Sequence, residues 1–335
     1  MKARNRVTSA QVARRAEVSQ SAVSRSFTPG ASVAPGTRQR IMEAARELGY
    51  RPNAIARSLI SGRSRMIGLV AAYLDNQFYP IVLERLARAL QDRDYHTLLF
   101  ISEPGDQDRE LEKLLAYQVD AVVMASATLS SALARECLDA EIPVVLFNRD
   151  VPDSPASSVT SDNMAGGRLV ADYLLDSGHQ RFAYIAGAEN SSTNRDREAG
   201  FVRGLQSRGV KLHQREVGAY SHHGAAQATL AMMRSDAPPD AIFVANDHMA
   251  FAVLDTLRLT LGLRVPEDVS VIGFDDVPQA AWGAYSLTTV AQPTDLMIDA
   301  TVSVLFDQLE TGHAEPTRRC LPVELIERAT ARRPR

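Results

Sequence analysis

The chain has 335 residues, and 45% of them are hydrophobic, which is enough for a large core and too many residues for one compact core. It lacks the run of about 18 apolar residues that a membrane span needs, and its basic start lacks the apolar segment of a signal peptide. Its two cysteines, Cys137 and Cys320, exclude a disulfide framework and a clustered zinc site, so we expect two or three domains in a cytoplasmic protein without a metal or other cofactor.

Charge is distributed unevenly along the chain. Residues 1–65 hold thirteen Lys or Arg and three Asp or Glu, a net formal charge of +10, whereas the remainder carries −13. Such asymmetry indicates a basic module that meets a polyanion. The alternative is a solvated basic tail, which the helical spacing of apolar residues in this segment disfavours.

Three short helices are predicted within residues 8–49. Thr8 can cap the first, SAQVARRA, and Ser19 can cap the second, on which Val23 and Phe27 point inward. A turn-rich stretch follows, and Thr37 is expected to cap the third helix, which Gly49 ends.

Two short helices joined by a tight turn and supported by a third form a helix-turn-helix module, whose second helix enters the DNA major groove. The stretch VSQSAVSRSF presents small hydrogen-bonding groups suited to base edges, a small Ala22 suited to a thymine methyl and Arg25 for guanine or phosphate. Serine hydroxyls suit phosphate oxygens, although each serine alone could be an ordinary surface residue. The predicted DNA contacts are Thr8, Ser19, Gln20, Ser21, Ala22, Ser24 and Arg25.

The order V-T-x-x-x-V-A-x-x-A-x-V-S-x-x-x-V-S-R, then T-R-x-R-I-x-x-A-A-x-E-L-G-Y-x-P-N, then A-R-S-L, closely resembles the lactose-repressor family of bacterial transcription regulators. The resemblance extends across essentially the whole chain. One departure is Glu17, which occupies a turn position usually held by glycine. If this position needs a positive φ, a non-glycine residue costs roughly 1 kcal/mol there.

Residues 52–65 follow as a hinge and linker. Asn53 can cap a helix, but AIARSLIS is too short to be a stable helix by itself in water. The resemblance implies that this segment becomes helical when two copies meet on operator DNA, and that Leu59 enters the minor groove as a wedge. Ala56 would allow close approach, and Arg57 would lie near phosphate. The alternative is an ordinary interdomain linker.

From Met66 onward, short apolar runs alternate with amphipathic stretches, which indicates βαβ units and parallel sheets. The predicted fold is α/β: a three-helix helix-turn-helix domain and hinge, followed by a core of two doubly wound parallel-sheet subdomains, which the resemblance implies is periplasmic-binding-protein-like. The predicted boundaries are 1–51 for the DNA-binding domain, 52–65 for the hinge, 66–161 plus 292–320 for the N-terminal subdomain, 162–291 plus 321–330 for the C-terminal subdomain, and 331–335 for a disordered tail.

Polar residues and aromatic rings follow the ends of several predicted strands. Ligands of open α/β sheets bind beyond those ends, so we expect an effector site in the cleft between the two sheets. The resemblance carries Arg197, Asn246 and Asp275 over as effector contacts, with aromatic rings over the ligand. The predicted effector contacts are Phe78, Tyr79, Asn148, Thr193, Arg197, Tyr220, Asn246 and Asp275.

These groups suit a polyhydroxylated ring, so a sugar, a sugar derivative or a sugar acid is expected, with a nucleobase as a further option. Each assignment has a structural alternative. Asn246 or Asp275 could cap the segment that follows it, with Asp276 the more structural of the two aspartates, and Phe78 and Tyr79 could belong to the core. Arg197 could be a surface residue.

Enzyme classes are disfavoured. The chain lacks a G-x-G-x-x-G or G-x-x-x-x-G-K-[ST] nucleotide motif and a G-x-S-x-G nucleophile elbow. His222 and His223 are adjacent, so they do not form a metal-binding pair of the i,i+4 type. We therefore expect a protein that is not an enzyme.

The sequence thus predicts a ligand-responsive, cytoplasmic, nucleoid-associated regulator, most simply a repressor, with no membrane contact. A two-fold-symmetric operator calls for a homodimer, and the residues after Ala329 lack the leucine heptads of a tetramerising tail. The resemblance implies that cleft closure changes the hinge spacing near Ile60 to Arg65. The alternative is a sugar-binding receptor of a transport system without DNA binding, which the basic first module disfavours.

Overall fold

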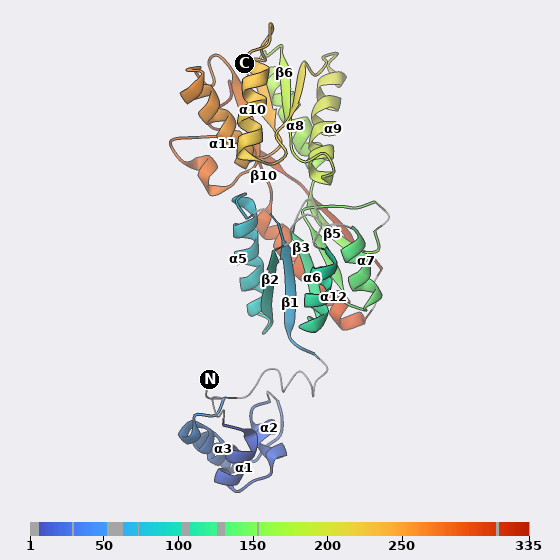
Figure 1. Cartoon of the computed structure of the whole chain (residues 1–335), viewed down its shortest axis with the longest axis vertical. Helices are drawn as coiled ribbons and strands as arrows, with labels where there is room; N and C mark the ends of the chain where they lie inside the picture. The colour runs from blue at the N-terminus through green and yellow to red at the C-terminus, as the bar shows by residue number, and fades with distance from the viewer. Residues whose placement is uncertain are drawn as a thin grey trace. The chain divides into compact units, whose positions relative to one another are not determined.

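The computed structural model describes residues 7–28, 30–51, 63–72, 74–101, 107–125, 131–152, 154–312 and 315–334. The chain divides into two compact units, Met1–Ser64 and Arg65–Arg335, which are drawn in Figure 1. The described part of the first unit contains three helices, and the second unit contains two sheets with their covering helices.

The first unit packs α1 (Ser9–Ala16), α2 (Gln20–Ser26) and α3 (Pro35–Leu48) around a small core. Val12, Val23 and Ile41 are fully buried at its centre, one from each helix. Small residues such as Ala13 and Ala44 complete this core, because each helix buries a single apolar stripe.

The turn at Glu17 and the start of α3 both bear on the sequence predictions. Glu17 has φ 55°, in the left-handed region, so the departure from glycine falls where the backbone does need a positive φ. The predicted start of the third helix at Thr37 is wrong. The helix begins at Pro35 after Ala34, because proline suits the first helical position, where the missing N–H costs nothing.

The second unit contains two mostly parallel sheets. In the N-terminal subdomain the strand order is β11-β5-β4-β3-β1-β2, and in the C-terminal subdomain it is β12-β10-β9-β8-β6-β7. Only β12, paired to β10, is antiparallel among the described pairings. The strands are β1 (Met66–Ala71), β2 (His96–Ile101), β3 (Ala121–Ala125), β4 (Val144–Phe147), β5 (Ser157–Ser161), β6 (Phe182–Ala186), β7 (Gln214–Val217), β8 (Ala241–Val244), β9 (Ser270–Asp275), β10 (Thr288–Ala291), β11 (Arg318–Leu321) and β12 (Glu324–Ile326).

Helices cover both faces of the sheets (Figure 1). In the C-terminal subdomain, α8 packs against α9 and α10 packs against α11. The helices are α5 (Phe78–Gln91), α6 (Gln107–Ala116), α7 (Ser131–Asp139), α8 (Asn163–Asp176), α9 (Ser192–Ser207), α10 (His222–Met233), α11 (Asp247–Asp255), a π-helical turn (Thr256–Thr260), a 3₁₀ turn (Pro278–Ala281) and α12 (Thr294–Thr311).

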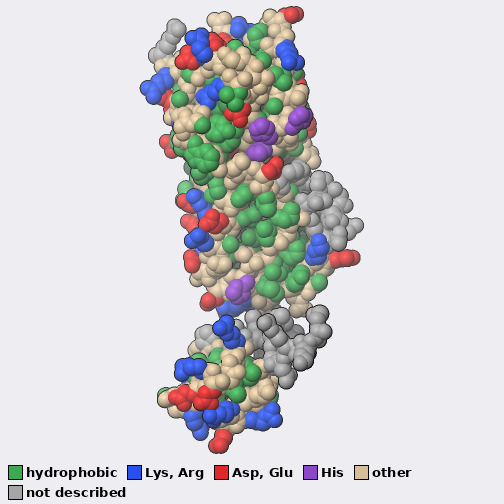
Figure 2. Space-filling model, turned by 60° about the vertical axis from the view of Figure 1, so that its left-hand side comes forward, with side chains coloured by type: hydrophobic (Ala, Val, Ile, Leu, Met, Phe, Trp, Pro, Cys, Tyr) green, Lys and Arg blue, Asp and Glu red, His purple; other side chains and the backbone are tan. Residues whose placement is uncertain are grey.

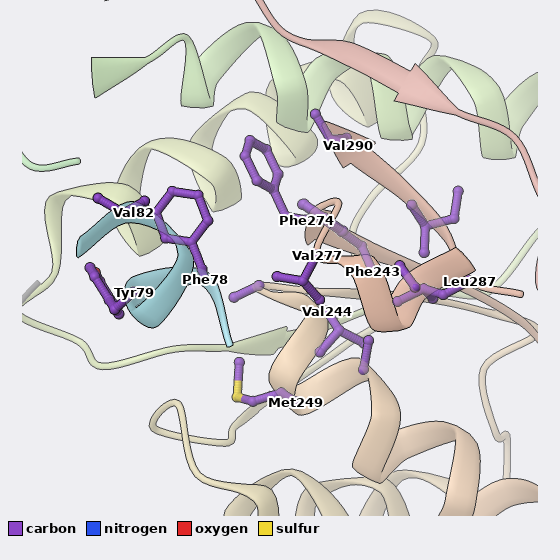
Figure 3. Packing of buried hydrophobic residues seen from close by; sticks show 14 of the residues in the cluster. Phe78, Tyr79, Val82, Phe243, Val244, Met249, Phe274, Val277, Leu287 and Val290 are labelled. Carbon is purple, nitrogen blue, oxygen red and sulfur yellow. The ribbon is translucent and has the colours of Figure 1, made fainter. Parts of the chain in front are cut away.

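The chain crosses between the two sheets after β5, after β10 and after β11. Helix α12 follows the second crossover and packs back on β4, β5 and α5 of the N-terminal subdomain. One buried hydrophobic cluster includes side chains from both subdomains, among them Phe78 and Val277, which lie near each other in Figure 3. The crossovers and this shared cluster place the carboxyl ends of both sheets at one cleft.

The end of the chain differs from the prediction of a disordered tail from residue 331. Ala331 is buried, and the backbone N–H of Arg332 donates to the Ser270 hydroxyl. The Arg332 guanidinium also lies 2.7 Å from His179 Nδ1. The backbone carbonyl of Arg332 accepts a hydrogen bond from the Ser177 hydroxyl. Residues 331–334 therefore pack on the C-terminal subdomain, because a short polar segment is ordered when its backbone and side chains find partners.

Candidate functional site

The predicted DNA contacts from Ser19 to Arg25 occupy α2 and its cap, whereas Thr8 precedes α1. Gln20, Ser21, Ser24 and Arg25 are exposed, whereas Ala22 is half-buried against the core. The exposed groups form one polar stripe because Val23 and Ser26 face inward on the same helix. The inner face of α2 is therefore held by the core of the first unit, and its outer face is accessible to a partner.

Local hydrogen bonds hold this surface in place. The Ser19 hydroxyl accepts from the Ala22 N–H at 3.2 Å and contacts the Ser21 hydroxyl at 3.0 Å, so Ser19 caps α2. The Gln20 amide donates to the Ser9 hydroxyl at 2.8 Å. Thr8 precedes α1, and its N–H donates to the Gln11 side chain at 2.8 Å.

Four of the predicted DNA contacts belong to the hinge and lie outside the described residues. They are Asn53, Ala56, Arg57 and Leu59.

The predicted effector residues converge in the second unit. One cavity is lined by Asn76 and by Phe78, Tyr79, Asn148, Thr193, Arg197, Tyr220, Asn246 and Asp275, which are all eight of the predicted effector contacts. They come from α5, the end of β4, α9, the loop after β7, the cap of α11 and the end of β9. Its volume is about 20 Å³, so its walls lie close together.

Arg197 is the central polar group of this cavity. Only 2% of its surface is exposed, so the surface alternative is wrong. Its Nε donates to Asn163 Oδ1 at 2.8 Å, its Nη1 donates to the Ala245 carbonyl at 2.6 Å, and Nη1 lies 3.4 Å from Asp275 Oδ1. The guanidinium carbon stands 3.6 Å above the centre of the Phe274 ring. These contacts fix the plane of the guanidinium before any ligand arrives.

Close helix packing places Arg197. An added Cβ at Gly167 on α8 would lie 2.1 Å from the Arg197 carbonyl oxygen on α9. Only glycine permits this approach of two helical backbones. No local pattern in the sequence points to Gly167 or to Asn163 on the same helix, although Asn163 accepts a hydrogen bond from the Arg197 side chain.

Asp275 accepts from the Gln292 amide at 2.8 Å as well as lying beside Arg197. Burial raises the pKa of the Asp275 carboxyl, and the charge of Arg197 lowers it in part. Its neighbour Asp276 accepts from Arg328 at 2.6 Å, which supports its reading as the more structural of the two. Asp275 is thus an acceptor in the cavity wall and not a helix cap.

Asn246 both caps a helix and lines the cavity. Its Oδ1 accepts from the Met249 N–H at 3.0 Å, which confirms the predicted N-cap of the following helix. Its Nδ2 is buried in the cavity wall. Asp247 follows it, fully buried, accepting from the Thr289 hydroxyl and the Val277 N–H. Burial, together with the nearby charge of Asp275, raises the pKa of Asp247.

Three buried polar atoms in the cavity wall lack a hydrogen-bond partner within the described part of the chain. They are Asn148 Oδ1, Arg197 Nη2 and Asn246 Nδ2. A buried polar atom without a partner costs about 1–3 kcal/mol, so three such atoms around one cavity make it the candidate site for a polar ligand.

Strained backbone accompanies these groups. Asn148, Tyr220 and Asp275 have φ of 55°, 58° and 129°, a region that side-chain-bearing residues rarely adopt. Each such conformation costs roughly 1–3 kcal/mol and tends to occur at functional sites. An added Cβ at Gly187 would lie 2.2 Å from the Tyr220 ring, so a glycine there makes room for the ring.

Aromatic and hydroxyl groups complete the wall. Phe78 and Tyr79 are both buried and belong to the hydrophobic cluster as well as the cavity, so the core alternative and the cavity role hold together. The Tyr220 hydroxyl lies 3.0 Å from Thr193 Oγ1 and 3.2 Å from Ser191 Oγ. This chain of hydroxyls can reorient to donate to a ligand or accept from it.

The described residues offer neither a cluster of metal ligands nor a helix suited to cross a membrane. Within the described ranges, three or more His, Cys, Asp or Glu side chains nowhere gather in a way that could hold a metal ion. Among the same residues, none of the helices is both long and apolar enough to cross a membrane.

Comparison with known proteins decides the family. Residues 8–53 match the family described as "Bacterial regulatory proteins, lacI family", and residues 171–331 match "Periplasmic binding protein-like domain". The HTH-type transcriptional regulator CelR of Thermobifida fusca is 32% identical over 98% of this chain and 99% of its own length. The chain belongs to the lactose-repressor family of bacterial transcription regulators.

Solved structures of this family agree with the fold. A lac repressor dimer bound to operator and the anti-inducer ONPF has a TM-score of 0.88 at 26% identity, covering 97% of this chain and 99% of that chain. A CelR-cellobiose complex has a TM-score of 0.74 at 30% identity, covering 97% and 100%. The HTH-type transcriptional repressor PurR of Aliivibrio salmonicida is 31% identical over 91% of this chain and 92% of its own length.

For this lactose-repressor-family chain, the predicted family and fold class are therefore confirmed. The protein is a DNA-binding transcription regulator with an N-terminal helix-turn-helix domain and a periplasmic-binding-like core of two parallel-sheet subdomains. The alternative of a transport receptor without DNA binding is wrong, because the DNA-binding family matches residues 8–53. The named relatives are transcription regulators and not enzymes.

Proposed function

We propose that this regulator is a cytoplasmic homodimer, without enzymatic activity, that represses transcription from a pseudo-palindromic operator and responds to a sugar or sugar acid in the cleft. The effector part of the proposal rests on Arg197, Asn148 and Asn246, which line the same cavity and each carry a buried polar atom without a partner among the described residues. The relative CelR, whose structure is of a cellobiose complex, supports a sugar.

The chemistry of the cavity wall favours hydroxyl groups. Arg197 Nη2 and Asn246 Nδ2 can donate, Asn148 Oδ1 can accept, and the Asp275 carboxylate can accept from two hydroxyls of one ring. The rings of Phe78 and Tyr220 offer apolar faces to the C–H groups of a sugar. A site with buried donors and acceptors rejects analogues that lack the matching hydroxyls, because its polar atoms stay unpaired.

Effector binding is expected to move the two subdomains. A volume of about 20 Å³ around Arg197 holds on the order of one water molecule, so a sugar ring enters only if the walls separate. Gln292, at the second crossover, donates to Asp275 and accepts from Ser161 at the first crossover, both at 2.8 Å. The crossover strands are therefore connected to the effector site through this amide.

That movement would change the spacing of the hinge segments in a dimer. Couplings of this kind are typically about 1–3 kcal/mol and are reciprocal between effector and DNA. The hinge residues Asn53, Ala56, Arg57 and Leu59 lie outside the described residues, so their part in DNA binding stays a prediction.

A dimer is supported by apolar surface in the N-terminal subdomain. Leu99 and Ile101, on the edge strand β2, are 51% and 49% exposed, and Tyr117 is 55% exposed. Figure 2 shows hydrophobic side chains gathered on one face of this subdomain. An exposed apolar edge strand invites a partner, and a second copy is the partner that a two-fold-symmetric operator needs.

Selection from a random DNA library with the full-length protein tests the proposal. The expected result is enrichment of a two-fold-symmetric site whose affinity falls steeply as salt rises, because phosphate contacts release counterions. A scrambled site of the same length is the control. The selection is repeated with a mixed pool of sugars and sugar acids, because a corepressor would be needed for binding if the effector acts in that sense. Failure to enrich a symmetric site under both conditions would contradict the proposal.

A further inference from the structure

A second, larger cavity adjoins the effector cavity. Its volume is about 520 Å³, and it shares two wall residues, Phe78 and Asp275, with the cavity around Arg197. Ligand pockets of proteins usually measure about 300–1,000 Å³, so the second cavity has the volume of a binding chamber, whereas the first does not.

Three segments build this second chamber. The first turns of α5 contribute Phe78, Ile81 and Arg85, and the loop after β9 contributes residues 275–278 and Ala281. The second crossover and the start of α12 contribute residues 292–296, and Arg328 closes the wall. The chamber therefore has walls from both subdomains, and it adjoins the cavity around Arg197 at Phe78 and Asp275.

The charged groups of the chamber wall are paired with one another. Arg85 Nη1 lies 2.7 Å from Asp295 Oδ1, and Arg328 Nη2 lies 2.6 Å from Asp276 Oδ1. Both arginines that line the chamber thus have a carboxylate partner, and Asp275 has Arg197. The wall carries no surplus positive charge for a phosphate or carboxylate, although its oxygens and N–H groups can still bind hydroxyls.

Apolar surface lies between these ion pairs. Phe78, Val277 and Pro278 face the chamber, and Figure 3 shows Phe78 and Val277 approaching from different subdomains. Alternating apolar faces and neutral polar groups match a pyranose ring, which presents C–H faces and a rim of hydroxyls. A charged ligand would gain no unpaired counter-charge here, because the charged side chains of the wall already have partners.

We propose that the effector is an uncharged saccharide of two linked rings, with one ring held at Arg197 and Asp275 and the second in the chamber between Arg85–Asp295 and Arg328–Asp276. This inference rests on the proposed function and narrows it. Phe78 and Asp275, shared by both cavities, contact the linkage between the rings. A single ring at Arg197 would leave the larger chamber to water, so the second ring adds binding contacts that a monosaccharide lacks.

Native mass spectrometry of the full-length protein tests the size and charge of the effector. The protein is incubated with an equimolar mixture of neutral monosaccharides (glucose, galactose, xylose), neutral disaccharides built from them and the corresponding aldonic acids. A retained neutral disaccharide, bound at least about tenfold more tightly than its monosaccharides by calorimetry, is the expected result. A monosaccharide bound equally well, or a preferred acid, overturns this inference and leaves the proposed function standing. If no saccharide of any size is retained, the proposed effector and this inference fall together.

A variant that fills the chamber gives a second test. Thr294 is the first residue of α12 and lines the chamber, so Thr294→Phe should lower the ratio of disaccharide to monosaccharide affinity by about tenfold or more. Ser303→Phe, an exposed position of the same helix that lines neither cavity, is the matched control and should leave the ratio unchanged. An unchanged ratio in a Thr294→Phe protein with normal thermal unfolding overturns the second-ring site.

Discussion

The two candidate binding regions of this regulator are built in opposite ways. The polar side chains on the outer face of α2 and at its cap are exposed, and Gln20 and Ser19 already have hydrogen-bond partners. In the cleft, Arg197, Asn148 and Asn246 are buried, and each keeps one polar atom without a partner in the described structure. The comparison indicates that the polar face of α2 costs little free energy in the absence of DNA. The cleft around Arg197, in contrast, stores unfavourable free energy that a polar ligand would relieve.

Removing the guanidinium at the centre of the cleft should have the largest effect. Arg197→Ala leaves the buried Asp275 carboxylate beside an empty space and removes bonds to Asn163 and Ala245, which costs roughly 3–5 kcal/mol of unfolding free energy. The effector response should be lost while operator binding at low temperature persists. Urea unfolding and effector-titrated DNA binding measure both effects.

The neighbouring Arg195→Ala is the matched control, because Arg195 is exposed on the same helix and pairs only with Asp196 among the contacts described. Its expected change is within about 0.5 kcal/mol. Equal losses in the two variants would sink the central role of Arg197.

The helix contact behind Arg197 comes next in size. Gly167→Ala places a methyl group 2.1 Å from the Arg197 carbonyl, so α8 and α9 must move apart, at a cost of about 1–3 kcal/mol. Effector affinity should fall together with stability, because the guanidinium moves with its helix. Gly283→Ala is the control, since an added Cβ meets nothing within 4 Å there. Thermal unfolding compares the two, and equal midpoints would contradict the packing argument.

A change on the exposed face should separate stability from recognition. Gln20→Ala removes a side chain suited to a base edge, so discrimination at one operator position should fall by about 1–3 kcal/mol, with a change in unfolding free energy within about 0.5 kcal/mol. Gln39→Ala, exposed on α3, is the control. Binding to a set of single-base operator variants measures this, and an unaltered preference at every position removes Gln20 from the base contacts.

The smallest expected effect is that of pH on the closure of the cleft. His248, 8% exposed on α11, lies 3.3 Å from Gln77 and 3.8 Å from Asp75 of the opposite subdomain. Burial lowers the pKa of His248 from its ordinary value of 6.5, Asp75 raises it in part, and His222 lowers it further. Protonation therefore favours the state in which His248 is hydrated.

The stabilisation of the closed cleft by neutral His248 should be present above pH 6.5 and lost as the pH falls through the lowered pKa. One titrating group changes an equilibrium by less than about tenfold per pH unit. We expect the fraction of closed protein, followed by fluorescence of a label pair across the cleft, to fall on acidification. His248→Gln should abolish that pH dependence, and a persisting dependence in this variant would assign it elsewhere.

The sequence predicted the regions to different extents for physical reasons. The helix-turn-helix follows from local spacing of apolar residues and caps, so only the start of α3 was misplaced, by the preference of Pro35 for a first helical turn. The eight predicted effector contacts line one cavity because parallel strands bring their carboxyl ends together, and their role in binding an effector stays a prediction. Their partners Asn163 and Gln292 were missed, because a side chain that orients another has no local pattern of its own.

The central claim, that a polar cleft ligand is coupled to DNA binding, is tested most directly by one equilibrium measurement. Operator affinity of the full-length protein is measured with and without the saccharide that it retains, and saccharide affinity with and without operator. We expect the same factor in both directions, between about 5-fold and 150-fold. Unchanged affinities in both directions, with the saccharide bound, would contradict it.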